Sequence, residues 1–215
     1  MRLSTRIASV GLTLASFAFA TSINTGAAGV NWQVAFNGGA AAAVIAETGT
    51  LPVQPGFVGG WVPNGSGNTG VWVGRTAGGG NFAVPTDGSQ VGVYVYTLAI
   101  GGLNTGSFIA QYAADNNIAW TISGGGSLGG TTSCGVPSAT DNDDCYSTLR
   151  TLTGTGITAS TIITATVRNG PQGATGPNPS GLLVRGDVSP VPEPSTYAML
   201  ALGGVAVALA RLRRR

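Results

Sequence analysis

The residue types on which most enzymes rely for proton and group transfer are scarce in this 215-residue sequence. It contains no histidine, and all ten of its cationic side chains are arginines. Ser-His-Asp triads, Cys-His dyads, histidine-bound metals, P-loop phosphate sites and lysine Schiff bases are therefore excluded. A glycosidase needs two carboxylates about 5–10 Å apart, but no motif selects such a pair. We find no catalytic constellation and expect the protein not to be an enzyme.

The two cysteines, Cys134 and Cys145, are separated by ten residues. In an exported chain such a pair most simply forms a disulfide, which contributes about 2–3 kcal/mol in the chain-entropy description. Two thiolates are too few ligands for zinc, and the spacing differs from that of a redox Cys-x-x-Cys motif. We therefore expect a structural disulfide that holds residues 131–148 as a surface loop.

Carboxylates gather inside that loop at Asp141, Asp143 and Asp144, and Asp115 begins a second cluster with two asparagines. Calcium takes six to eight oxygen ligands on a preformed backbone, and a disulfide-closed acidic loop could supply some of them. The EF-hand spacing is not met, because the required glycine and the final glutamate are missing. We expect solvated acidic turns and no cofactor, with a calcium site at the three loop aspartates as the alternative.

Tryptophan and tyrosine rings can stack on the C–H faces of sugars, but in a β-sandwich alternating aromatic residues more often fill the core. Trp120 lies in the alternating apolar run 118–122 and is expected in the core. Trp61 and Trp72 flank the glycine- and asparagine-rich segment 63–68, where a loop mouth could expose them. These two residues are the candidates for glycan contact.

The elements that must position these residues lie between glycine-rich turns. The sequence has 36 glycines, 43% hydrophobic residues and only 8% charged residues, which argues against disorder, and its glycines follow no collagen period. Several β-branched and aromatic runs alternate with a period of two, and only 40–47 could start a helix. We expect one all-β domain, an antiparallel β-sandwich or jelly roll. The clearer runs are 30–36, 57–62, 71–75, 91–100, 107–113, 117–122, 158–168 and 181–185.

The N-terminal end has the composition of a secretory signal. Its first six residues carry two arginines and lead into an uncharged apolar run at 7–20. Small residues at Ala18-Phe19-Ala20 offer a cleavage site, and Gly26-Ala27-Ala28 offers a second choice. We expect a signal helix within a leader that covers residues 1–28.

The C-terminal end combines three features in order. They are the triplet Pro192, Glu193 and Pro194, an apolar run at 197–210, and a terminus with four arginines. As a helix the run would rise about 21 Å, less than the roughly 30 Å of a hydrocarbon core. The arginines favour the cytoplasmic side of a membrane. We expect a short transmembrane helix here.

This ordered combination resembles the PEP-CTERM sorting signal, which an exosortase-type enzyme reads and removes. The resemblance covers residues 189–215 and implies an exosortase substrate of a Gram-negative bacterium, a class associated with exopolysaccharide and biofilm matrix. It implies that enzyme and the export machinery as partners, with the inner membrane contacted transiently through 197–210. The alternative is a stiff Pro-Glu-Pro linker before an ordinary membrane anchor.

A second resemblance concerns the segment between the two ends. Its motifs follow one another in the order of a β-sandwich module seen repeatedly in PEP-CTERM proteins, although glycines at 124–126 replace the module's usual Asn-Gly turn. We therefore expect the sandwich domain at 29–188, and the resemblance implies a fold rather than an activity. The motifs are residues 94–98, 112–116, 169–170 and 176–184.

The formal net charge of +2 depends on the arginines of the two ends. Between residues 31 and 190, four arginines stand against seven acidic residues, which gives a net charge of −3. A weakly acidic domain without a basic patch lacks the cations that neutralise phosphates. We therefore expect no binding to nucleic acid.

Together these features predict an exported, non-enzymatic protein of the cell surface or extracellular matrix, associated with exopolysaccharide or biofilm. The alternative is a carbohydrate-binding module or adhesin on the same sandwich, which would use Trp61 and Trp72. A hydrolase would require turnover on glycans, for which no residues are selected here.

Overall fold

The computed structural model describes residues 20–46, 70–75, 92–101, 105–115, 117–135, 145–169, 181–190 and 194–212. The chain divides into two compact units. One spans residues 20–191 and is called the body below; the other comprises residues 1–19 and 192–215. Within the second unit the structure describes one helix, α1, at Pro194–Leu212.

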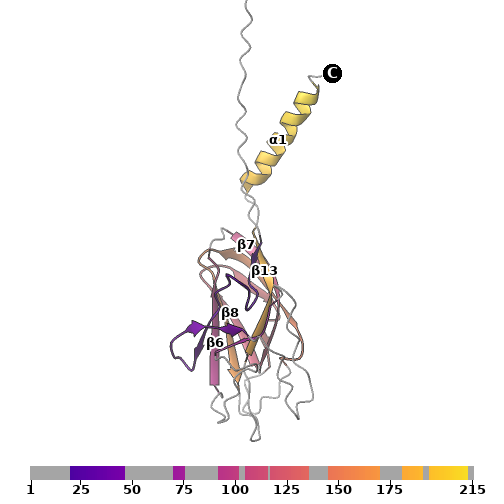
Figure 1. The fold of residues 1–215 in the computed structure, drawn as a ribbon. Coiled ribbons are helices and arrows are strands. Elements are labelled where there is room, and N and C mark those ends of the chain that lie inside the picture. Colours follow the sequence, from indigo (N-terminus) through magenta and orange to yellow (C-terminus); the bar gives the residue numbers. More distant parts are fainter. Residues whose placement is uncertain are drawn as a thin grey trace, which may run out of the picture. The chain divides into compact units, whose positions relative to one another are not determined.

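The described strands of the body form two sheets, which Figure 1 shows as two layers, one labelled by β7 and β13 and the other by β6 and β8. The first sheet has seven strands, in the order β4-β5-β13-β7-β11-β9 with β1 also paired to β13. The second has six, in the order β10-β8-β12-β6-β2-β3. Their strand pairs are antiparallel. The bounds are β1 Thr21–Ser22, β2 Gln33–Phe36, β3 Ala42–Ala43, β4 Ile45–Ala46, β5 Val73–Gly74, β6 Gly92–Ala99, β7 Thr105–Asp115, β8 Asn117–Ser123, β9 Ser127–Gly130, β10 Ser133–Cys134, β11 Arg150–Thr158, β12 Ile162–Asn169 and β13 Gly181–Pro190.

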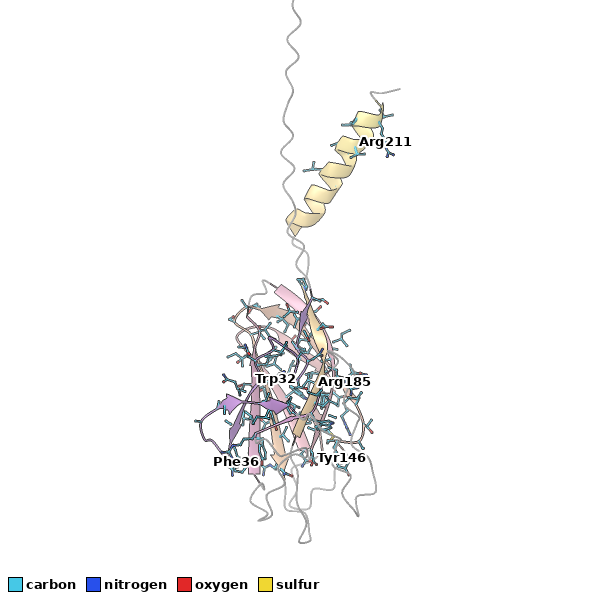
Figure 2. All side chains as sticks on the ribbon, in the orientation of Figure 1. Trp32, Phe36, Tyr146, Arg185 and Arg211 are labelled. Atoms are coloured by element: carbon cyan, nitrogen blue, oxygen red, sulfur yellow. A yellow bond between two sulfur atoms is a disulfide. The ribbon has the colours of Figure 1, made fainter. Side chains whose placement is uncertain are left out.

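The core lies between the two sheets, as expected for a β-sandwich. Tyr112 of β7 and Trp120 of β8 meet across it, with ring centroids 5.2 Å apart in an edge-to-face arrangement. Trp32 joins them from the chain before β2, with its ring 6.3 Å from that of Trp120 (Figure 2). Such aromatic pairs favour offset or edge-on geometry because their quadrupoles then attract. The predicted antiparallel β-sandwich and the core position of Trp120 are confirmed.

The period-two pattern of the sequence identifies the buried face of the second sheet. In β6 the buried side chains are Tyr94, Tyr96 and Leu98, and the residues between them are only half-buried. Strand β12 repeats this pattern with Ile163, Ala165 and Val167. Because successive strand residues point to opposite faces, each strand contributes one apolar row to the core.

The one segment between the two ends that was expected to allow a helix, 40–47, does not form one over its described residues. It contains β3 and β4, which pair with different sheets: Ala42 lies opposite Val34, and Ile45 lies opposite Gly74. Alanine has a high helix propensity, but cross-strand pairing outweighs it here. The run is therefore a crossover between the two layers.

The body extends beyond both predicted limits of the sandwich domain, 29 and 188. At its start, Thr21 and Ser22 of β1 pair with Val188 and Asp187 of β13. At its end, Pro190 is still paired with Gly106 of β7. The predicted leader at 1–28 therefore overlaps a strand of the folded body.

Neither the expected N-terminal signal helix nor the expected C-terminal transmembrane helix is confirmed. Residues 1–19, where the signal helix was expected, lie outside the described residues. The apolar run 197–210 does lie within α1. Among the residues that the structure describes, no helix is both long and apolar enough to cross a membrane.

Candidate functional site

The C-terminal exit of the body leads directly into the Pro-Glu-Pro triplet. Strand β13 lies between β7 and β5, and its Val188 is fully buried. Pro192 and Glu193 lie outside the described residues, whereas Pro194 is the first residue of α1. Proline suits a first helical turn because its fixed φ fits the helix and its missing N–H would have no intrahelical partner there. The third residue of the triplet therefore begins the helix.

The N-terminal end of the body lies beside this exit. Beyond the two β1 pairs, the backbone N–H of Ile23 donates to the carbonyl of Gly186 at 3.0 Å. The N–H of Thr25 donates to the carbonyl of Val184 at 3.1 Å. The first and last described segments of the body are thus neighbours along five residues of β13, from 184 to 188.

Helix α1 exposes a large share of its apolar side chains. Large hydrophobic residues that are 56–68% exposed are Leu202, Val205, Val207, Leu209 and Leu212. Arg211 lies in the last turn (Figure 2), where a cation is favoured by the helix dipole. Exposed apolar surface of this kind marks a site of interaction with another protein or with lipid.

The predicted disulfide between Cys134 and Cys145 is confirmed, with Cα atoms 5.9 Å apart. Cys134 ends β10 of the second sheet, while the carbonyl of Cys145 accepts a hydrogen bond from Ala114 of β7 in the first sheet, at 3.1 Å. The bridge therefore links the two layers. The expected surface loop at 131–148 is only partly found in its described residues: Thr131 and Thr148 are exposed, but Cys145 is fully buried and β10 is paired with β8.

The predicted acidic clusters have different outcomes. Asp141, Asp143 and Asp144 lie outside the described residues. Within the described residues, no group of three or more His, Cys, Asp or Glu side chains could hold a metal ion. Asp115 is not the solvated turn residue that was expected: it ends β7, is only 2% exposed, and burial raises the pKa of its carboxyl well above the ordinary value. Strands β7 and β8 meet here and bring it into the protein interior.

The two candidates for glycan contact also differ. Trp61 lies outside the described residues. Trp72 is fully buried, so the expectation that it is exposed at a loop mouth is wrong. It packs with Ala113, Leu183 and Tyr146 in a second, smaller apolar cluster. Trp72 and Leu183 come from segments that pair in register, because Val73 lies opposite Leu182.

The final part of the chain matches a known family. Residues 190–215 match the PEP-CTERM protein-sorting motif. The chain is a PEP-CTERM sorting domain-containing protein. The motif indicates a protein that exosortase processes and sorts to the cell surface, so exosortase is a partner. No curated protein and no solved structure matches the chain.

The PEP-CTERM match begins at Pro190, the last residue of β13. The sorting signal therefore starts where the folded body ends. The sequence pattern did not predict that Thr21 to Thr25, at the other end of the body, belong to the folded domain. No local signal could have found them, since their partners lie at 184–188, on the last strand of the sandwich.

Proposed function

We propose that this PEP-CTERM protein is an exported, non-enzymatic component of the cell surface or extracellular matrix of a Gram-negative bacterium, associated with exopolysaccharide. The observation that carries the proposal is the sorting motif at 190–215, which begins at the last residue of the final described strand of the sandwich. Exosortase would remove the tail and leave the body as the functional product.

The division of the chain supports removal of the tail. The body ends at Val191, and the triplet and α1 belong to the other compact unit. A cut within or after the triplet leaves every described strand of the body in place. The exposed apolar side chains of α1 would then serve the precursor alone, by holding it at the inner membrane through 197–210 until processing.

The disulfide supports export to an oxidising compartment. Disulfides persist in the periplasm and at cell surfaces, and they are rare in the cytosol of mesophiles. The bridge between Cys134 and Cys145 is largely buried and links both sheets, so it contributes to the stability of the body. It has the position of a structural bond rather than that of an exposed redox pair.

The outer face of the second sheet supports contact with a hydrated polysaccharide. Thr121, Thr164, Thr97 and Gln33 lie opposite one another in register across β8, β12, β6 and β2. Thr121 and Gln33 are exposed, and the two threonines between them are half-buried. Hydroxyl and amide groups both donate and accept hydrogen bonds, as do sugar hydroxyls.

The test replaces Pro192, Glu193 and Pro194 by alanine in the chain expressed in its own host. The variant should keep its tail and be lost from the outer surface, as judged by intact mass and cell fractionation. Ser195→Ala with Thr196→Ala is the matched control, because it changes two neighbouring residues and leaves the triplet intact. Unchanged processing and surface delivery of the triplet variant would contradict the sorting role.

A second measurement addresses the matrix association. The surface protein should co-sediment with exopolysaccharide isolated from the host, and Thr121→Val with Thr164→Val should reduce the bound fraction several-fold. Thr151→Val with Thr153→Val, on the first sheet, controls for the loss of two strand hydroxyls. Equal binding by both pairs of variants would contradict a role for this face.

A further inference from the structure

We propose that the leader is removed by cleavage of the bond between Ala20 and Thr21, so that Thr21 is the first residue of the exported protein. This inference rests on the proposed export. The sequence offers two small-residue sites, Ala18-Phe19-Ala20 and Gly26-Ala27-Ala28, and the composition of the leader does not choose between them. The structure favours the first site, because a cut after Ala20 keeps residues 21–28 in the body, whereas a cut after Ala28 removes them.

The residues between the two sites are part of the first sheet. Strand β1 pairs with β13, and the main chain of Ile23 and Thr25 continues the contact through hydrogen bonds to Gly186 and Val184. Ile23, at 2% exposed, belongs to the main hydrophobic core. A cut after Ala28 would remove this segment and uncover the core beneath it.

The side chains of this segment form hydrogen bonds with main-chain groups elsewhere in the body. Asn24 Oδ1 accepts a hydrogen bond from the N–H of Gly186 at 2.6 Å. Thr25 is fully buried, and its hydroxyl accepts from the N–H of Val184 at 3.0 Å and donates to the carbonyl of Val71 at 2.6 Å. Polar groups that lose their partners inside a protein are costly, so a product starting at residue 29 would be strongly destabilised.

Two more hydrogen bonds connect residues 23–25 to other parts of the body. The indole N–H of Trp32 donates to the carbonyl of Ile23 at 3.0 Å, and Trp32 is itself 2% exposed. The N–H of Val71 donates to the carbonyl of Thr25 at 3.0 Å. Segments from the start, the middle and the end of the body therefore all bond to residues 23–25. A cut after Ala20 preserves each of these bonds.

The boundary of the body agrees with this assignment. The compact unit begins at Ala20, and Ala20 itself is exposed. The new first residue would then lie beside the last strand of the body, because Thr21 is paired with Val188, which is four residues before the triplet in the sequence.

The experiment compares two exposed alanines, each the last residue of one candidate site. Wild-type protein, Ala20→Glu and Ala28→Glu are recovered from the outer surface of the host, and their first residues are read by N-terminal sequencing. A charged residue next to the cut blocks processing because these sites require small side chains. Wild type and Ala28→Glu should begin at Thr21 in equal amounts, while Ala20→Glu should show at least a tenfold loss of this product.

A wild-type protein that begins at Gly29 would overturn the assignment while leaving export intact. A surface protein that still begins at Met1 would contradict both the assignment and the proposed leader. A further variant keeps the test independent of cleavage efficiency: deletion of residues 21–28 from the full chain should leave no protease-resistant protein outside the cell. Wild-type levels of resistant protein from this variant would overturn the claim that the body needs β1.

Discussion

The backbone N–H of Val184 donates a hydrogen bond to the side-chain oxygen of Thr25 at 3.0 Å, although 159 positions separate the two residues in the sequence. The same hydroxyl donates to the carbonyl of Val71. One buried threonine therefore joins three distant segments: the start of the body, the segment before β5, and β13. This relationship fixes the first residues of the body against its last strand.

Thr25→Val should destabilise the body, because valine has nearly the same shape but neither donates nor accepts a hydrogen bond. The N–H of Val184 and the carbonyl of Val71 would each lose this partner, at about 1–3 kcal/mol for the buried N–H of Val184. Urea unfolding monitored by tryptophan fluorescence measures the change. Thr25→Ser is the control, since it keeps the hydroxyl and should retain most of the stability. Wild-type stability of Thr25→Val would contradict a stabilising role of the hydroxyl, and an equal loss in both variants would show that the methyl group contributes as much as the hydroxyl.

Reduction of the bridge between Cys134 and Cys145 should lower the free energy of unfolding by about 3 kcal/mol, as expected for a closed loop of this size. The double variant Cys134→Ala with Cys145→Ala should show a similar loss and no further response to reductant, which makes it the control for side effects of the reagent. Urea midpoints with and without reductant provide the measurement. A wild-type midpoint unaffected by complete reduction would contradict a stabilising role.

Asp115 should make the body less stable as the pH rises from about 4 toward neutrality. Burial raises the pKa of this carboxyl in the folded chain, so between the unfolded-state and folded-state pKa values the native chain holds the extra proton. The free energy of unfolding then falls with increasing pH. Asp115→Asn should raise the unfolding temperature at pH 7 and change it little near pH 4.

Thermal unfolding across this pH range measures the effect of Asp115→Asn. Asp187→Asn, which removes a carboxylate from an exposed position in β13, controls for the change in net charge. A constant difference between Asp115→Asn and wild type at all pH values would mean that the buried carboxyl does not titrate differently in the two states.

Gly154→Ala should disrupt the packing between β11 and β7. Gly154 lies opposite Phe108 in register, and a methyl group there would overlap the Phe108 ring, which is buried in the core. Overpacking of this kind costs about 1–3 kcal/mol. Gly101→Ala is the matched control, because a methyl group at Gly101 meets open space. Equal unfolding temperatures for the two variants would show that the ring moves aside without cost.

Local patterns in the sequence were sufficient for much of the fold. The alternation at 91–100 predicted β6 and its two faces, because period-two burial is a property of the strand itself. The pairing of Cys134 with Cys145 followed from an even count of cysteines in a chain with an export signature. The sorting signal was recognisable because its three parts are contiguous and need no fold to be read.

Strand β11 is an element that local sequence patterns did not predict. Its sequence from Arg150 to Thr158 has two glycines, and its alternation breaks at a register shift between Thr155 and Ile157. Gly156 lies in that shift with φ of 66°, a left-handed conformation that glycine adopts without strain. The bulge turns Ile157 into the core, so a strand that looks like a polar loop carries a fully buried residue.

The sequence by itself determined that the chain is a β-rich protein with a PEP-CTERM sorting motif at 190–215 and without histidine or lysine chemistry. Only the tertiary structure decided that Trp72 and Asp115 are buried and that Thr21 begins a strand. The physical reason is the same in each case. Burial and strand pairing depend on what the other segments of the sandwich place against a residue, and those segments are far away in the sequence.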